Sequence, residues 1–294
     1  MKKLTISLFV VVFYSILHSL TVFAQDTMWK DIEKVIGKEG VIKDETEKFT
    51  FPRYDLNVKI KDLTIDPALA LTSWVIFIKM QDKYMMMGDL VLKETEVDTA
   101  INKLVSNELQ ITALHNHILN ETPKIMYLHF SGQGDAVVLA RRIRTVLEVT
   151  ATPFTPAPLK KISESTDWNK VESILGYSGK SAGKVLQISI ARKEVFTEKN
   201  MALPPQAGMT ISINFQSAGE KVASTGDFLL TAEEVNPVVK VLTENNILVT
   251  AIHNHMLFES PRLFFLHFWS VDNPERLAEG LHLALEKINI RRSQ

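Results

Sequence analysis

Histidine is unevenly distributed along this chain of 294 residues, and one short segment concentrates it. The segment HNHILNETPKIMYLHF contains His115, His117 and His129, together with Glu121. Three imidazole nitrogens and one carboxylate oxygen form a ligand set that suits a divalent transition metal such as Zn, Mn, Fe, Ni or Cu. The segment therefore predicts a site for a transition metal or a small ligand.

The same residues return 138 positions later, which indicates an internal duplication. The stretch ITALHNHILNETPKIMYLHF at 111–130 recurs as VTAIHNHMLFESPRLFFLHF at 249–268, and GDLVL at 88–92 recurs as GDFLL at 226–230. The second ligand set consists of His253, His255, Glu259 and His267. Six of the eight histidines belong to the two segments. The sequence thus predicts two tandem repeats with one site in each.

An aspartate in each GD pair is the candidate for a catalytic role. In the alternating pattern of MMMGDLVL, Asp89 falls on the face opposite the apolar residues, and Asp227 is its twin. Each could bind the metal, hold a metal-binding histidine or act as a general base. The competing interpretation, which the sequence favours, is that each aspartate closes a turn with its glycine.

Strand and helix patterns alternate within each repeat and define the expected fold. Short apolar segments at 74–80, 85–92, 111–118 and 125–131 are typical of strands. A leading helix is expected at 29–36, and two more helices should begin near Asp98 and Asp135, with twins near Asn236 and Asn273. The order predicts an α+β fold of two tandem repeats, each an antiparallel sheet with helices on one face, as in a permuted ferredoxin-like arrangement.

A hairpin of 111–118 with 125–131 would bring the histidines together. In a symmetric register His115 lies opposite His129, and His117 lies opposite Tyr127. All three imidazoles then share one face of the sheet, while the apolar face meets the helices. The competing interpretation is that these histidines are ordinary surface residues, or that they are buried in hydrogen bonds at an interface between the repeats.

The N-terminal segment and the composition limit where the protein can be located and what it can bind. Residues 1–24 have a basic start and an apolar centre, which predicts a secretory signal peptide cleaved after Ala24 and an extracytoplasmic protein. The alternative is a retained anchor, so any membrane contact would be through this segment. The chain has no cysteine, which excludes disulfides and thiolate ligands. A net charge of −1 argues against a nucleic-acid partner.

The domain boundaries follow from the duplication. The first repeat is expected at 25–149 and the second at 167–294, joined by a linker at 150–166 that is rich in Pro, Ser and Thr.

Several motifs together resemble a known family. The segments FPRYDLNVKI, ALTSWVIF, MGDLVL and TALHNHILNETPKIMYLHF, with the Asp-led helix that follows, resemble the bacterial exported proteins typified by the mycobacterial lipoproteins LppY and LpqO. The resemblance covers Trp29 to Glu148 and is clear again from Gly226 onward. It implies an exported protein without an established activity. This chain departs from the lipoproteins in having no lipobox cysteine.

Three functions are compatible with these features. The first is an exported protein that binds a transition metal or small ligand in each repeat. The second is a metalloenzyme resembling a bicupin, because His-x-His-x3-Glu is similar to the first cupin motif, although Leu128 stands where a cupin has glycine. The third is a structural or interaction module without a metal. The sequence names neither a reaction nor an oligomeric state.

Overall fold

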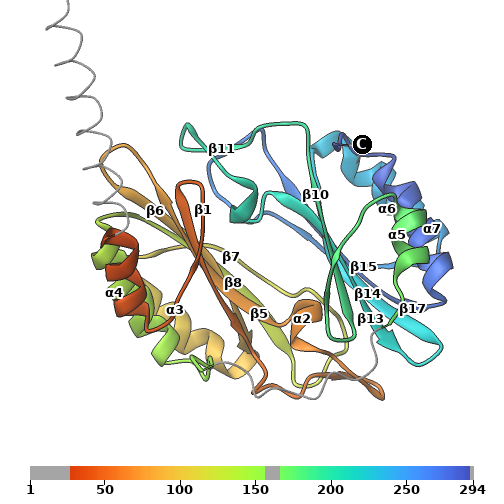
Figure 1. Ribbon diagram of the computed structural model, residues 1–294, viewed down its shortest axis with the longest axis horizontal. Coiled ribbons are helices and arrows are strands. Elements are labelled where there is room, and N and C mark those ends of the chain that lie inside the picture. The colour runs from red at the N-terminus through yellow and green to blue at the C-terminus, as the bar shows by residue number, and fades with distance from the viewer. Residues whose placement is uncertain (1–26, 156–165, 292–294) are drawn as a thin grey trace, which may run out of the picture.

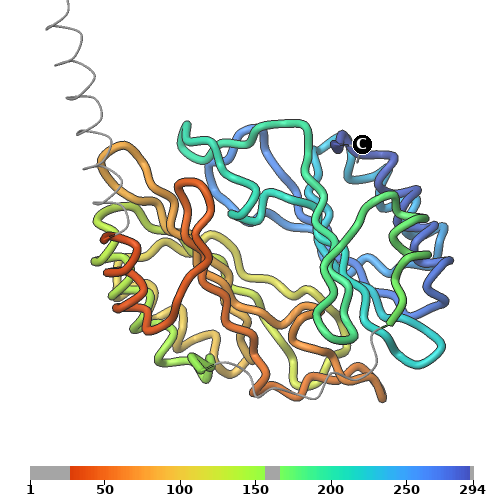
Figure 2. The backbone as a smooth tube through the Cα atoms, viewed as in Figure 1, coloured from red at the N-terminus to blue at the C-terminus, as the bar shows by residue number. Residues whose placement is uncertain are grey.

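Two similar halves pack face to face in the computed structural model, which describes residues 27–155 and 166–291. Each half is a sheet with helices on its outer side, so the layers run helix, sheet, sheet, helix (Figure 1). Figure 2 shows that the chain completes one half before it enters the other. The expected signal peptide and residues 156–165 of the expected linker lie outside the described residues. No helix in the described ranges has the length and apolarity needed to span a bilayer.

The first repeat is built on a six-stranded antiparallel sheet. Its strand order is β1 (Val41–Lys43), β2 (Thr46–Pro52), β5 (Thr72–Lys79), β6 (Tyr84–Lys93), β8 (Ile125–Gly134) and β7 (Gln110–His115). The helix at 27–36, α3 (Val97–Ser106) and α4 (Ala136–Glu148) belong to the same repeat. Their buried apolar residues pack with those of the sheet in one cluster that includes Trp29, Phe77, Leu104 and Ile143.

The second repeat has the same arrangement. Its sheet runs β15 (Leu248–His253), β17 (Phe264–Asp272), β14 (Lys221–Leu230), β13 (Thr210–Ala218), β10 (Val185–Ala191) and β9 (Lys180–Ala182). Its helices are α5 (Asn169–Leu175), α6 (Ala232–Glu244) and α7 (Pro274–Leu285). The α+β class and the two repeats are therefore confirmed. Both sheets are open and covered by helices, whereas a cupin would require barrels.

Helix starts agree with the sequence for α3, which begins at Val97 next to Asp98, and for one further helix of each repeat. Asp135 caps α4 by accepting from the Val138 amide, and Asn273 caps α7 by accepting from Glu275 and Arg276. The prediction of a start near Asn236 was wrong, because α6 begins earlier, behind Thr231. Thr231 and Glu234 form a capping box there, and Pro237 lies inside the helix.

Strand register also differs from the sequence prediction. A β-bulge near Thr112 shifts β7 against β8, so Ala113 pairs with His129 and His115 pairs with Tyr127. Such a bulge adds one residue to one strand of a pair. β7 ends at His115, so His117 lies beyond the strand. The turn expected at Gly88 and Asp89 was also wrong, because both lie within β6.

Short elements complete the molecule between the two sheets. They are the two-residue strands β3 (Lys59–Ile60), β4 (Leu63–Thr64), β11 (Thr197–Glu198), β12 (Met201–Ala202) and β16 (Glu259–Ser260), the helical turn α2 (Pro67–Ala70), and the 3-10 turns η1 (Glu94–Glu96) and η2 (Pro205–Ala207). Pro67 of α2 and Pro205 of η2 lie 138 positions apart, as the repeated HNH segments do, so α2 corresponds to η2.

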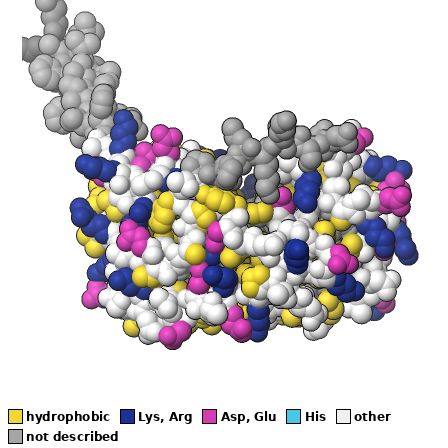
Figure 3. All heavy atoms as spheres, turned by 90° about the horizontal axis from the view of Figure 1, so that it is seen from below, with side chains coloured by type: hydrophobic (Ala, Val, Ile, Leu, Met, Phe, Trp, Pro, Cys, Tyr) yellow, Lys and Arg dark blue, Asp and Glu magenta, His cyan; other side chains and the backbone are white. Residues whose placement is uncertain are grey.

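The inner faces of the two sheets bury apolar residues against each other. Ile76, Ile78 and Met85 of the first repeat join the main cluster of the second repeat. In another cluster Tyr127 and Val91 pack with Val185 and Ala223 of the second repeat. Burial of this apolar area stabilises the contact between the repeats. The face drawn in Figure 3 mixes lysine and arginine with aspartate and glutamate, in keeping with the near-neutral charge.

The start of the expected linker packs on the first repeat. The ring of Phe154 lies edge-on to Phe51 at 5.7 Å, and the guanidinium of Arg144 lies 3.8 Å above the Phe154 ring. Thr150 and Thr152 are buried. Residues 150–155 are therefore held in place by packing.

Candidate metal centre

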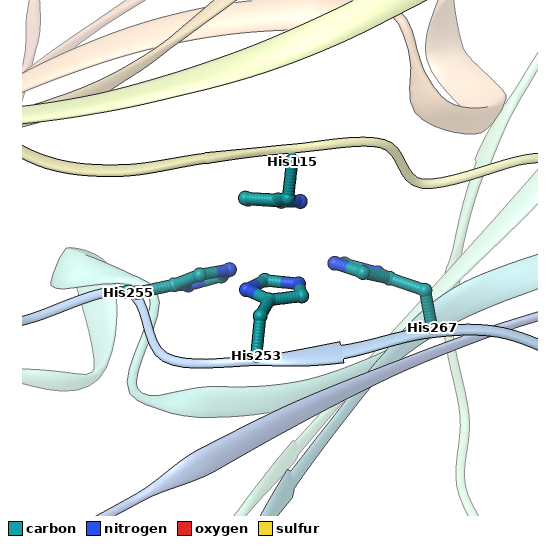
Figure 4. Close-up of side chains that lie close together, drawn as sticks. All are labelled: His115, His253, His255 and His267. Atoms are coloured by element: carbon teal, nitrogen blue, oxygen red, sulfur yellow. The ribbon is translucent and has the colours of Figure 1, made fainter.

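The six repeated histidines meet in one cluster between the two sheets. His115 comes from the end of β7, and His253 comes from the end of β15. Figure 4 shows His115 facing His253, with His255 and His267 approaching from either side. The sequence predicted one site per repeat, but the structure combines both ligand sets into a single centre. The inner faces of the sheets carry the histidines, so packing the sheets together brings all six to the same place.

The cluster has an approximate twofold symmetry that exchanges the repeats. His115 stacks on its own counterpart His253, with ring centres 3.6 Å apart. The pairs His117–His267 and His129–His255 are exchanged by the same rotation, and each has ring centres 3.8 Å apart. Each repeat therefore supplies one ring to each of these three close histidine pairs.

Main-chain carbonyls orient several of these rings. The Nδ1 atom of His115 lies 3.1 Å from the Asn116 carbonyl, and Nδ1 of His253 lies 3.3 Å from the Asn254 carbonyl. Nδ1 of His267 lies 3.2 Å from the carbonyl of Gly226. A carbonyl only accepts, so each Nδ1 carries the proton and leaves the lone pair on Nε2. This is the arrangement that prepares a histidine to bind a metal through Nε2.

All six Nε2 atoms are buried and have no hydrogen-bond partner among the described residues. A buried polar atom without a partner costs about 1–3 kcal/mol. Six such atoms in one place are a large energetic cost for a fold that is stable by only about 5–15 kcal/mol. A metal ion that takes these lone pairs would remove that cost.

Two subsets of nitrogen and oxygen atoms are close enough to share an ion. One atom from each of His115, His253, His255 and His267 lies within 4.8 Å of the others. A second group with the same spacing consists of His117, Asp227 and His267. Zn–N bonds of about 2.0–2.1 Å place ligands on one ion up to about 4 Å apart, so small side-chain movements would complete either site.

Metal binding requires neutral imidazoles, and the pKa is lowered in five of the six histidines. Burial lowers the pKa of His115, His117 and His255, and neighbouring imidazoles lower it further. The same causes bring the pKa of His129 to about 3. Burial beside His267 brings the pKa of His253 to about 4.

The two candidate aspartates lie next to the cluster. Asp89 pairs in register with His129, and its Oδ1 lies 3.7 Å from Nε2 of His129. Asp227 pairs with His267, and its Oδ1 lies 2.6 Å from Nδ1 of that ring. Both carboxylates are thus placed to bind a metal or to orient a metal-binding histidine.

The protonation of the two aspartates differs. Burial, and then the nearby charge of Asp227, raises the pKa of Asp89 well above its usual value. Burial also acts to raise the pKa of Asp227, but the adjacent His267 lowers it overall. The two carboxyls at the centre therefore have pKa values that are shifted in opposite directions.

The two glutamates of the predicted ligand sets lie elsewhere. Glu121 Oε1 accepts from the amide of Ile125 at 3.2 Å. Glu259 Oε1 accepts from the amide of Leu263 at 3.3 Å and pairs with Arg262 at 3.1 Å. Neither glutamate belongs to the groups whose ligand atoms lie close together. In these positions the glutamates hold the turn that follows each pair of histidines.

A polar cavity of about 160 Å³ adjoins the cluster. Its lining includes Asp89, Asp227, His117, Tyr127 and Asn214. The Tyr127 ring stacks on His117 at 3.3 Å, and its hydroxyl donates to the Ala70 carbonyl at 3.0 Å. Sequence reasoning had treated Tyr127 only as a partner for a histidine and had not identified Asn214. The cavity shows that small molecules have space beside the histidines.

A buried arginine in each repeat was also missed by sequence reasoning. Arg53 pairs with Asp55 at 2.9 Å and Glu96 at 3.2 Å. Its counterpart Arg192 pairs with Glu194 and Glu234 at 2.9 and 2.6 Å. The signal available in the sequence was an arginine with an acidic residue two positions later, present in both repeats. These clusters join strands to the start of α3 or α6 and are structural.

Comparisons with known proteins add a family but no activity. No curated protein matches the chain. Among solved structures, the trimeric bacterial microcompartment shell protein PduB matches with 11% identity over 87% of this chain and 97% of that chain, with a TM-score of 0.24. EtuB from Clostridium kluyveri matches with 7% identity over 84% of this chain and 91% of that one, with a TM-score of 0.21. Scores this low carry no functional argument.

One family model matches both repeats, at residues 30–149 and 169–287. Its description is Domain of Unknown Function (DUF1259). The two matches coincide with the halves that the structure separates and with the duplication seen in the sequence. The chain therefore belongs to the DUF1259 family and carries two tandem copies of its domain.

Proposed function

We propose that this protein binds a transition metal in one composite centre to which both repeats contribute. The observation that carries the proposal is the set of six buried Nε2 atoms without hydrogen-bond partners, gathered between the two sheets. Imidazole ligands without thiolates suit Zn, Cu, Ni or Fe. His115, His253, His255 and His267 form the primary site, because their ligand atoms lie closest together.

The approximate symmetry supports a shared centre over two separate ones. The three histidine pairs with the shortest ring distances each combine one histidine from each repeat, so neither repeat assembles the cluster alone. The third function considered from the sequence, histidines buried between the repeats without a metal, explains the burial equally well. It leaves all six Nε2 atoms without partners, whereas a metal gives a partner to each imidazole that binds it.

The polar cavity beside the centre favours a second candidate function, that of a metalloenzyme. Catalysis by a metal needs an open coordination position and a group that can move a proton. The cavity gives access to His117, and Asp89 and Asp227 line it. Asp227 is the candidate base and Asp89 the candidate acid in such a reaction.

Export remains part of the proposal. The signal-like N-terminus and the resemblance to the LppY and LpqO proteins support an extracytoplasmic location after cleavage near Ala24. Fractionation of cells that express the full chain, with mass determination of the exported product, tests it. Recovery of the uncleaved chain in the cytoplasm would contradict it.

Elemental analysis tests the metal centre. The full chain is purified without a histidine tag, supplied with a mixture of Zn, Cu, Ni and Fe salts and then dialysed. We expect one tightly bound ion per chain and at least a tenfold lower content in the double variant His115→Ala/His253→Ala. His282→Ala is the matched control, because this histidine lies on α7 away from the cluster. Two ions bound independently by the separate repeats, or none, would contradict the proposal.

A further inference from the structure

The histidine cluster has two sides that the approximate symmetry should make alike but that differ in volume. We call them the open side, which is the cavity at His117, and the closed side, which is the space at His255. The open side encloses about 160 Å³, whereas the closed side encloses about 10 Å³. His117 and His255 are counterparts, and so are Gly226 and Gly88 in the two linings.

Two exchanges of side chain between the repeats account for the difference. Trp74 borders both sides and pairs in register with Asp89, whereas its counterpart Ser212 lines the open side alone and pairs with Asp227. The Trp74 ring extends to η2, where its Cζ2 atom would lie 3.6 Å from a Cβ atom at Gly208. In the equivalent space at α2 the smaller Ser212 leaves room.

The second exchange changes polarity as well as volume. Met87 lines the closed side, and its counterpart Thr225 lines the open side. The closed side is otherwise lined by apolar residues such as Phe130, Ala207 and Met209. The open side therefore combines space with polar walls, which is typical of a ligand site.

Three hydrogen-bond donors of the open side are engaged by α2. Gln187 Nε2 donates to the Ala68 carbonyl at 2.7 Å, and Asn214 Nδ2 donates to the Leu69 carbonyl at 2.8 Å. The Tyr127 hydroxyl donates to the Ala70 carbonyl. Three consecutive carbonyls thus take up the donors of three lining side chains.

Several atoms in the wall that can accept hydrogen bonds have no partner among the described residues. Asp89 is 5% exposed, and its Oδ1 has no hydrogen-bond partner. Nε2 of His117 is likewise without a partner, and the carboxylate of Asp227 lines the same space. A ligand that carries O–H or N–H donors can satisfy these atoms, whereas a ligand with acceptors alone would leave them unsatisfied and be repelled by the carboxylate.

We infer that the open side binds a small molecule rich in O–H or N–H donors, such as a polyol or amino alcohol, directly beside the metal. An engineered cavity of about 150 Å³ holds benzene, so the ligand is no larger than a six-membered ring. The inference deepens the proposed function and rests on it for the metal that the ligand contacts. The ligand's size and donor character follow from the cavity alone.

The test uses glycerol as a donor-rich probe and malonate as a probe of similar size that has only acceptors. The zinc-loaded full chain is titrated with each probe, and binding is followed by saturation-transfer NMR of the probe. We expect saturable glycerol binding and at least tenfold weaker malonate binding. In the cobalt-loaded chain the bound glycerol protons should show paramagnetic relaxation, because the probe lies beside the ion.

Variants that copy the closed side locate the binding. Ser212→Trp and Thr225→Met fill the open side with the counterpart residues, and each should weaken glycerol binding at least tenfold while the metal content stays unchanged. Ser212→Ala is the control, because it keeps the space. If Ser212→Trp fails to fold, as judged by circular dichroism, Thr225→Met decides the question.

The outcomes separate the two proposals. A metal-loaded chain that binds no glycerol, that binds malonate as tightly, or that keeps full glycerol affinity in the filled variants overturns the inference alone. A chain that takes up no metal overturns the proposed function. The glycerol titration of that metal-free chain then still decides whether the cavity binds donor-rich molecules.

Discussion

The two repeats place the same three histidines around one centre, but they surround them with different walls. Trp74 and Met87 close the space beside His255, whereas Ser212 and Thr225 leave it open beside His117. The ligands themselves are positioned by strands and by main-chain carbonyls that both repeats keep. The comparison teaches that the positions of the histidines and the space beside them are set by separate residues.

The repeats agree most closely away from the centre. Arg53 and Arg192 are fully buried, and each pairs with two carboxylates, one of which begins a helix. Here both the residues and the contacts are duplicated. Matched substitutions in the two repeats should therefore change the stability unequally at the histidine cluster and equally at the two arginines.

The largest expected effect is a loss of folding stability at acidic pH in the metal-free chain. The pKa of His129 falls to about 3 and that of His253 to about 4, against 6.5 for a free imidazole. Below pH 6.5 the unfolded chain binds protons that the folded chain does not, so stability falls as the pH falls toward these values. One pKa unit corresponds to about 1.4 kcal/mol, which gives losses of at most on the order of 5 kcal/mol for His129 and 3 kcal/mol for His253.

Urea unfolding of the metal-free chain between pH 7 and pH 3.5 measures this loss. His129→Leu should remove more of the acid sensitivity than His253→Leu, while His282→Ala should leave it unchanged. Equal profiles for the wild type and both leucine variants would contradict the assigned pKa values.

Removal of either buried arginine should cause the next largest loss in the free energy of unfolding. Arg53→Ala leaves Asp55 and Glu96 without their cation, and Arg192→Ala does the same to Glu194 and Glu234. Loss of one partner from a buried ion pair costs about 3–5 kcal/mol. Guanidinium unfolding should show losses that agree between the repeats within about 1 kcal/mol.

The control for the arginines is Arg276→Ala, whose pair with Asp272 is exposed and spans 3.6 Å. Such a pair contributes under about 1 kcal/mol. A large loss in one repeat and a small loss in the other would show that the arginine clusters are not equivalent.

Exchange of Met87 and Thr225, which line the two sides, should have the smallest effect on the free energy of unfolding. The two changes should differ most from each other. Met87→Thr removes buried apolar volume from the closed side and should cost about 2 kcal/mol in the free energy of unfolding. Thr225→Met places the longer side chain in an existing cavity and should change stability by less than about 1 kcal/mol. Thermal unfolding of both variants measures the contrast, and equal losses would argue against the unequal cavities.

Much of this architecture could be predicted from sequence because the duplication was visible. The repeated HNH segment placed His115 and His253 at equivalent positions, and the caps at Asp135 and Asn273 marked two helices correctly. The alternation in MMMGDLVL placed Asp89 on the histidine face, where the structure has it. These inferences depend on local pattern, which a single sequence contains.

The remainder depends on contacts between distant residues. The bulge near Thr112 moved His117 beyond β7, and alternation along a strand gives no sign of such an extra residue. The union of both ligand sets depends on how the two sheets face each other, which the pattern within one repeat cannot specify. Glu121 looked like a ligand by spacing, but its hydrogen bond to the Ile125 amide turns it toward its own loop.

The rotation that exchanges the repeats has a consequence for how the centre arose. A single domain with one HNH segment would assemble the same six imidazoles by pairing with an identical molecule, since a twofold homodimer brings equivalent surfaces together. In such a pair every change of side chain occurs twice, so both flanks of the ion must be equally wide. Joining the two copies in one polypeptide removed that constraint, and a tryptophan could then stand on one flank opposite a serine on the other.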